Sequence, residues 1–125
     1  MHINRNKIKV LLVEDEKIPQ IASTHILIEC HCEVDIATTG LEALTIIMKN
    51  NYNIIFMDIG LKDIDGYEIT KRIKKANYNV PIIALTAHND KETEKSCLDA
   101  GMVDFLAKPL TMEKIQGIIR KLDLL

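Results

Sequence analysis

The sequence is poor in glycine, proline and cysteine, and it lacks any long apolar run. Five glycines and three prolines are spread over 125 residues, so no Pro- or Gly-rich tract divides the chain into two domains. Three cysteines, an odd number, argue against a disulfide framework. No apolar run approaches the ~20 residues that span a bilayer, and the N-terminus lacks the apolar core of a signal peptide. We therefore expect a single domain, in the cytoplasm, without membrane contact.

An excess of charge of one sign is missing as well. The formal net charge is -2 at pH 7, which gives no indication of a nucleic-acid-binding surface. Hydrophobic residues make up 47% of the chain and charged residues 27%, a balance typical of soluble globular proteins. The length is sufficient for a hydrophobic core. We therefore expect a globular protein that binds no nucleic acid.

Apolar runs alternate with stretches of helical periodicity along the chain. The apolar runs predict strands at residues 8–13, 34–37, 54–57, 81–85 and 104–107. The periodic stretches predict helices at residues 18–30, 40–48, 66–75, 90–100 and 111–122. Because continuous apolar strands imply a sheet that is covered on both faces, we predict an α/β, doubly wound fold. Its five parallel strands are expected in the flavodoxin-like order 2-1-3-4-5, with five helices.

Some details of the helices are also predicted. Thr111 is expected to cap the N-terminus of the last helix, and Gly101 is expected to end the fourth. The first helix is expected to carry Ile18, Ile21, Ala22, His25 and Ile28 on roughly one face.

Polar side chains stand at the C-terminal ends of four of these strands. They are Glu14 and Asp15 after the first, Asp58 after the third, Thr86 after the fourth and Lys108 after the fifth. In an open parallel sheet this edge is where ligands bind, so the side chains should converge. Neighbouring carboxylates repel one another unless a cation intervenes, and Mg²⁺ prefers such oxygen ligands. The sequence therefore predicts a site for Mg²⁺ and a phosphoryl group.

A carboxylate such as Asp58 can act as a nucleophile and form an aspartyl-phosphate. Phosphoryl transfer needs little beyond positioning and charge neutralisation, which Lys108 and the hydroxyl of Thr86 could assist. Taken singly, each residue has a simpler explanation as a turn former, a surface lysine or a hydroxyl bonded to backbone. These separate explanations do not account for the fact that all of these residues stand at strand ends.

Six segments in this order resemble one protein family, the response-regulator receiver domains of two-component phosphorelay signalling. The resemblance covers residues 8 to 122, which we expect to be the core of one receiver domain over residues 1–125 with no output domain. The segments are Val10–Asp15, Ile55–Asp58, Asp65–Glu68, Pro81–Ala87, Ala100–Gly101 and Lys108–Pro109. The segment 84–88 is similar to receivers that belong to, or work with, hybrid histidine kinases.

The resemblance implies a role for each site residue. Asp58 would be the phosphoacceptor and would take a phosphoryl group from a phosphohistidine in a Mg²⁺-dependent reaction. Asp15 would bind Mg²⁺ directly and Glu14 through water, while Asp58 and the backbone carbonyl of Gly60 would complete the protein ligands. Lys108 would pair with the phosphoryl group, and the Lys108–Pro109 bond would be cis.

The resemblance also implies a switch and its partners. Thr86 and Phe105 would move together after phosphorylation. A histidine kinase or a histidine phosphotransfer protein would be the phosphodonor, and a downstream protein would bind the fourth helix, fifth strand and fifth helix. The domain would catalyse its own phosphorylation and dephosphorylation, so it is expected to be a signalling switch and not an enzyme.

The sequence departs from the family pattern in three places. Lys62 stands where proline is common, so we expect a more flexible loop and a less firmly held Gly60 carbonyl. Glu16 stands where asparagine is frequent and adds negative charge beside the metal. His31 and Cys32 replace a common glycine–aromatic pair, and histidine can adopt the left-handed backbone that a helix end can require.

Three other interpretations remain open at this point. A receiver-like domain that binds partners without phosphorylation would not need the complete set of site residues. A hydrolase with an aspartate nucleophile usually has a second aspartate two residues later, where this chain has Gly60. Zinc binding by Cys30, His31 and Cys32 would require a second ligand pair at suitable spacing, which the sequence lacks.

Overall fold

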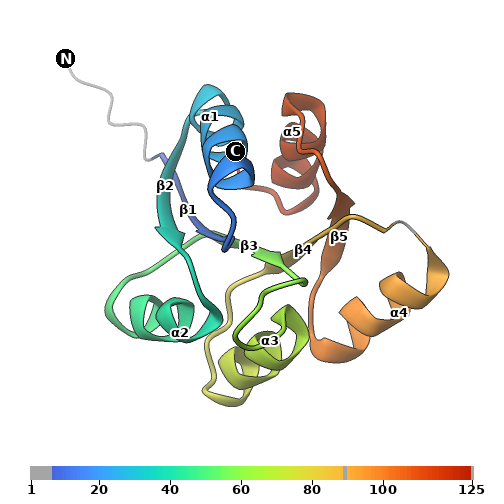
Figure 1. The fold of residues 1–125 in the computed structure, drawn as a ribbon. Helices are drawn as coiled ribbons and strands as arrows, with labels where there is room; N and C mark the ends of the chain where they lie inside the picture. The colour runs from blue at the N-terminus through green and yellow to red at the C-terminus, as the bar shows by residue number, and fades with distance from the viewer. Residues whose placement is uncertain (1–6, 89, 125) are drawn as a thin grey trace.

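The computed structural model describes residues 7–88 and 90–124 and contains one five-stranded sheet. All neighbouring strands are parallel, and their order is β2-β1-β3-β4-β5, which confirms the predicted fold (Figure 1). The strands are β1 (Ile8–Val13), β2 (Cys32–Ala37), β3 (Ile54–Asp58), β4 (Ile82–Thr86) and β5 (Asp104–Ala107). The helices are α1 (Lys17–Glu29), α2 (Gly40–Lys49), α3 (Gly66–Lys75), α4 (Lys91–Ala100) and α5 (Met112–Lys121).

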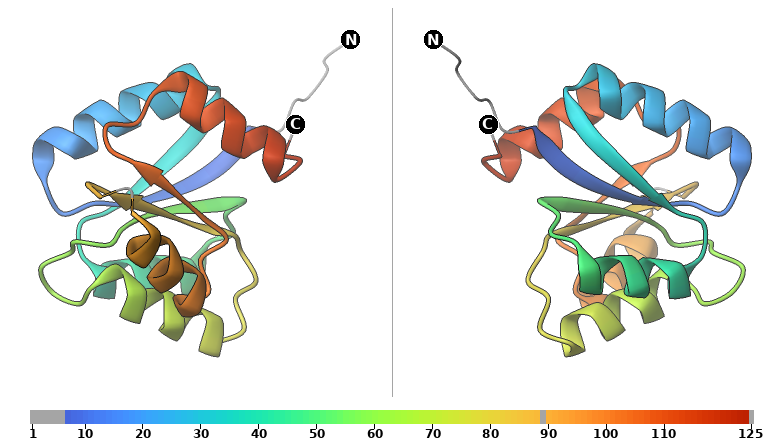
Figure 2. Two further views of the ribbon diagram at one scale, coloured as in Figure 1. Left: turned by 90° about the vertical axis from the view of Figure 1, so that its right-hand side faces the viewer. Right: turned by 90° about the vertical axis from the view of Figure 1, so that its left-hand side faces the viewer.

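The helices form two layers on opposite faces of the sheet. Helices α1 and α5 lie on one face, and α2, α3 and α4 lie on the other (Figures 1 and 2). Strand β1 shows why the sheet needs both layers. Val10 and Leu12 pack into the core under α1 and α5, whereas Leu11 and Val13 pack into the core under the other helices. Both sets are fully buried, as expected for a parallel sheet that is covered on each side.

Side-chain caps define the start of four helices. The side chains of Thr39, Asp65, Asp90 and Thr111 each accept a hydrogen bond from the backbone N–H three residues later. These caps satisfy N–H groups that have no partner inside the helix. The predicted cap at Thr111 is therefore confirmed. Gly101 follows α4 in the left-handed conformation with φ of 104°, and His31 adopts the same region after α1 with φ of 63°.

The residues predicted to share one face of α1 lie on the exposed side of the helix. Ile18, Ile21 and Ile28 are 82%, 60% and 58% exposed, and Ala22 and His25 are exposed as well. The buried side chains of the helix are Gln20, Ser23 and Leu27. Gln20 turns inward because its amide Nε2 donates to the backbone carbonyl of Glu14 at 2.8 Å, inside the protein. This hydrogen bond joins the helix to the end of β1, and Leu27 packs into the core on the same face, so the isoleucine stripe lies on the exposed side.

Between residues 7 and 124, Asn89 excepted, no helix is both long and apolar enough to cross a bilayer.

Candidate functional site

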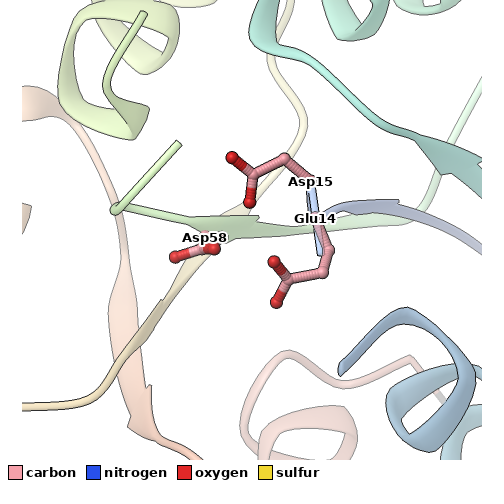
Figure 3. Close-up of side chains that lie close together, drawn as sticks. All are labelled: Glu14, Asp15 and Asp58. Atoms are coloured by element: carbon pink, nitrogen blue, oxygen red, sulfur yellow. The ribbon is translucent and has the colours of Figure 1, made fainter. Parts of the chain in front are cut away.

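Three carboxylates meet at the C-terminal edge of the sheet. Glu14 and Asp15 follow β1, and Asp58 ends β3; each offers one carboxylate oxygen to a group whose atoms all lie within 4.8 Å of one another (Figure 3). The register of the strands causes this convergence, because Val13 of β1 lies opposite Met57 of β3. The residues that follow this pair are therefore neighbours in space. The side chains predicted to form a metal site thus come together.

Burial sets the electrostatics of this group. Glu14 is 1% exposed and Asp58 is 7% exposed, while Asp15 is half-buried. Burial raises the pKa of Glu14 from its ordinary 4.5 to about 7; the hydrogen bond from Lys108 opposes this rise and the proximity of Asp58 adds to it. A carboxylate that gives up hydration in this way gains from any cation placed beside it.

Lys108 supplies one such cation from the end of β5. Its Nζ donates to Oε1 of Glu14 at 2.8 Å and lies 3.3 Å from Oδ2 of Asp58. Partial burial lowers the pKa of Lys108, but the two carboxylates outweigh this effect and the pKa is raised. Three carboxylates against one ammonium leave a deficit of positive charge. Because all the donors are oxygen atoms, the group fits a hard divalent cation such as Mg²⁺ better than a soft metal.

The loop between β3 and α3 closes one side of the site. The N–H of Gly60 donates to Oδ1 of Asp58 at 2.9 Å, and the N–H of Lys62 donates to Oδ2 of Asp15 at 3.0 Å. These amides orient two of the three carboxylates. The structure thus places Gly60 beside Asp58, where the resemblance implies a ligand, while the ligand role of its carbonyl remains a prediction.

Thr86 and Phe105 lie on the two strands farthest from β1. Thr86 is buried at the end of β4, its Oγ1 accepts from the N–H of His88 at 2.9 Å, and its carbonyl accepts from the N–H of Lys108 at 2.7 Å. Phe105 is half-buried and packs against the core shared by α2, α3 and α4. The Lys108–Pro109 bond is cis, as the resemblance implies. The ends of β4 and β5 are thus joined directly at the site.

Sequence reasoning missed three residues that hold the site in place. Gln20 fixes the carbonyl of Glu14, as described above. The Nζ of Lys114 donates to the carbonyls of Ala107 and Pro109, at 2.7 and 2.9 Å, on either side of Lys108. Asp63 accepts from the first two N–H groups of α2. None of these contacts follows from local periodicity, because each joins a side chain to backbone that only the fold brings near.

The three residues Cys30, His31 and Cys32 do not present a common ligand set. Both cysteine side chains are buried, whereas His31 is exposed. Burial raises the pKa of Cys32 to about 11, with a smaller contribution from Cys30. Thiols with raised pKa values in a buried position behave as small apolar residues.

Comparisons with known proteins all point to one kind of domain. A family model for the response regulator receiver domain matches residues 10–120. The chain is 37% identical over 121 residues to hybrid signal transduction histidine kinase L of Dictyostelium discoideum. It is 36% identical over 118 residues to the transcriptional regulatory protein PmrA of Pectobacterium parmentieri. These matches cover 90% and 91% of this chain but 7% and 51% of the two relatives, so the chain spans at most about half of their length.

Solved structures give the same result for the fold. The chemotaxis response regulator CheY4 of Vibrio cholerae superimposes with a TM-score of 0.85 at 26% identity, covering 94% of this chain and 99% of that one. The receiver domain of the sensor histidine kinase PA1611 of Pseudomonas aeruginosa has a TM-score of 0.84 at 34% identity, covering 93% and 97%. That receiver was solved with a magnesium ion coordinated in its active-site cleft.

Proposed function

Since the chain belongs to the family of response regulator receiver domains of two-component signalling, we propose that Asp58 accepts a phosphoryl group in a Mg²⁺-dependent reaction. The donor is a phosphohistidine of a histidine kinase or of a histidine phosphotransfer protein. The observation that carries the proposal is the contact of Lys108 with both Glu14 and Asp58, inside a cluster of three carboxylates. The domain catalyses its own phosphorylation and dephosphorylation and acts as a switch.

Glu14, Asp15 and Asp58 would hold the Mg²⁺, together with the carbonyl of Gly60. A magnesium ion in the cleft of the similar Pseudomonas receiver supports this assignment. Bound Mg²⁺ would neutralise charge on the phosphoryl oxygens during the transfer. The remaining chemistry belongs to Asp58. One of its carboxylate oxygens forms a bond to phosphorus while the bond between phosphorus and the donor's imidazole nitrogen breaks, and that nitrogen leaves with the electron pair.

Lys108 and Thr86 respond to the new charge. Before transfer, the ammonium of Lys108 divides its contacts between two carboxylates. After transfer, it pairs with a phosphoryl oxygen, because the added charge lies within its reach. Thr86 donates its hydroxyl to another oxygen, and Phe105 moves with it. The direct hydrogen bond between the ends of β4 and β5 supports this coupling. A downstream protein would read the change on the surface formed by α4, β5 and α5.

The phosphodonor would cover the surface beside Lys108. The donor histidine must reach Asp58, so the donor protein must contact the rim of the site. A hollow of about 360 Å³ lies there, lined by side chains of α1 and of the segment after β5 that include Ile18, Pro19 and Leu110. The exposed isoleucines of α1 continue this apolar surface. We therefore place the donor contact on α1 and the segment after β5, and the downstream contact on the surface formed by α4, β5 and α5.

Intact-mass spectrometry after incubation with acetyl phosphate tests the proposal. Wild type is expected to gain one phosphoryl group that requires Mg²⁺, and Asp58→Asn is expected to gain none. Asp99→Asn is the matched control, because Asp99 is exposed on α4, away from the site. Modification of Asp58→Asn at the wild-type rate would refute the assignment.

The same experiment separates the alternatives. A folded wild type that binds no Mg²⁺ and takes no phosphoryl group, even from a phosphorylated histidine phosphotransfer protein, would be a partner-binding domain without phosphorylation. Sustained hydrolysis of phosphate monoesters without an adduct would indicate a hydrolase.

A further inference from the structure

The loop between β3 and α3 is tied to the rest of the protein at a point that the sequence pattern did not indicate. With Lys62 in place of proline, this loop was expected to be loosely held. Instead, the carboxylate of Asp63 accepts from the N–H of Gly40 at 3.0 Å and from the N–H of Leu41 at 3.2 Å. Both donors belong to the first turn of α2. The loop is therefore fastened to a helix on the neighbouring part of the sheet.

At the start of α2, four N–H groups are divided between Asp63 and Thr39. The next two N–H groups of the helix are satisfied by Thr39: its Oγ1 accepts from Glu42 at 3.0 Å and its carbonyl accepts from Ala43 at 3.1 Å. Asp63 thus completes a helix N-terminus, where backbone N–H groups and the helix dipole both favour a negative charge. The carboxylate of Asp63 therefore serves two of the four N–H groups at the start of the helix, and Thr39 serves the other two.

The close approach of the loop to α2 is built into the sequence. A Cβ on Gly40 would lie 3.3 Å from the carbonyl oxygen of Ile64 and 2.5 Å from a side-chain carbon of Ile69. A larger residue at position 40 would therefore push the loop and α3 away. Slight burial raises the pKa of Asp63, but the N–H groups of Gly40, Ile64 and Leu41 outweigh it and lower the pKa overall. The clamp is thus made by the charged carboxylate.

The clamp lies next to the amides that orient the site. Lys62, the residue before Asp63, donates its N–H to Oδ2 of Asp15 at 3.0 Å. With Oδ2 occupied in this way, the orientation of the carboxylate is fixed and its other oxygen is available to a cation. The loop can hold this amide in place only if it is itself held, and Asp63 connects it to α2.

We propose that Asp63 is a positioning residue for the phosphoryl-transfer site, because its clamp on α2 holds the Lys62 amide against Asp15. The inference rests on the proposed function, in which Asp15 is a Mg²⁺ ligand. Removal of Asp63 would leave every ligand in place but would loosen the loop that orients them. Residues that hold metal ligands in this way typically affect metal affinity by 10- to 100-fold, and we expect about tenfold for this more remote position.

The test is a calorimetric titration with Mg²⁺ alone on wild type, Asp63→Asn and Thr39→Ala. Thr39→Ala is the matched control, because it removes a different cap from the same helix end and leaves the loop contact intact. Asp63→Asn is expected to weaken Mg²⁺ binding about tenfold, whereas Thr39→Ala leaves it within about twofold of wild type. An equal loss of Mg²⁺ affinity in both variants would overturn the inference, because the loss would then come from a weakened start of α2 and not from the contact with the loop.

A second control separates positioning from charge. Glu16→Gln removes one negative charge next to Asp15, and the hydrogen bond that Glu16 makes to Oε2 of Glu14 comes from its backbone N–H, which the substitution keeps. A loss of Mg²⁺ affinity as large as that of Asp63→Asn would attribute the effect to charge alone and overturn the inference. Hydrogen exchange provides a readout that does not need the metal. The Lys62 amide is expected to exchange faster in Asp63→Asn than in Thr39→Ala, and unchanged exchange would refute the clamp.

The outcomes also distinguish the two proposals. Suppose that wild type binds Mg²⁺ and is phosphorylated, and that Asp63→Asn equals it in Mg²⁺ affinity and in exchange of the Lys62 amide. This result would overturn the role of Asp63 and leave the proposed function standing. A wild type that binds no Mg²⁺ would overturn both.

Discussion

Gly66 offers a sharp test of how tightly the phosphoacceptor is packed. It is the first residue of α3, and a Cβ there would lie 2.6 Å from the carbonyl oxygen of Asp58 and 2.8 Å from Cα of Ile59. Both distances are about 1 Å shorter than ordinary contacts. Because both atoms are backbone, no side-chain rotation can relieve the clash. Gly66→Ala must therefore displace either α3 or the end of β3.

The expected magnitude follows from this geometry. Overpacking of a well-packed interior typically costs about 1–3 kcal/mol, so Gly66→Ala should lower the free energy of unfolding by that amount. Gly117→Ala is the matched control, since Gly117 lies within α5 and a Cβ there would meet nothing within 4 Å. Alanine favours a helix interior over glycine by about 0.5–1 kcal/mol, so this variant should be more stable than wild type. Replacement of glycine by alanine is thus expected to lower the free energy of unfolding at position 66 and to raise it at position 117.

Urea unfolding monitored by far-ultraviolet circular dichroism measures both effects, since the chain has no tryptophan. Phosphorylation of Gly66→Ala by acetyl phosphate, followed by intact mass, reports on Asp58. A misplacement of about 1 Å can cost on the order of 10²-fold in rate, so a loss of about tenfold or more is expected. Wild-type stability together with a wild-type rate would show that the fold accommodates a methyl group there, and the argument from close approach would be wrong.

Three further predictions concern pH, packing and thiol reactivity. In metal-free protein, the raised pKa of Glu14 means that the folded state holds a proton that the unfolded state has lost, so stability is full below pH 4.5 and falls as pH rises to about 7. Urea unfolding in EDTA should show that the free energy of unfolding of wild type falls by up to about 3 kcal/mol between pH 4.5 and 7, and that Glu14→Gln lacks this fall. Parallel pH profiles of wild type and Glu14→Gln would contradict the prediction. Phe56→Ala should cost about 3–5 kcal/mol in the same assay, because Phe56 is fully buried, whereas exposed Leu41→Ala should change stability by less than about 0.5 kcal/mol. A thiol reagent at pH 8 should label all three cysteines in urea but react slowly with the folded protein, because they are buried and burial raises the pKa of Cys32 to about 11; rapid native labelling would refute this.

Local patterns in the sequence predicted the fold and the convergence of Glu14, Asp15, Asp58 and Lys108 at one edge of the sheet. Strand β1 was predicted without error, and the ends of β3 and β4 differ by one residue from prediction. Continuous apolar runs determine such strands because only a sheet covered on both faces buries them. Once the strands are parallel, the residues that follow them meet at one edge. Glu14, Asp58 and Thr86 could therefore be grouped without knowledge of any contact.

The orientation of α1 could not be predicted in this way. Its sequence has an isoleucine stripe and a second stripe with Gln20, Ser23 and Leu27, and periodicity favours the first. The structure buries the second, because the Gln20 amide reaches the carbonyl of Glu14 inside the protein. A buried carbonyl without a partner is costly, so this hydrogen bond and the full burial of Leu27 both favour the face that turns inward.

The sequence by itself determined which side chains stand at the sheet edge, since each position depends only on where a short apolar run ends. Only the tertiary structure decided how those side chains are held. Lys108 contacts Glu14 across 94 positions of the chain, and Asp63 binds the start of α2 across 23. Each contact pairs a charge with a group on another element, and its partner is set by how the strands and helices pack. Periodicity describes one helix or strand at a time, whereas the energy of each charged contact depends on two such elements.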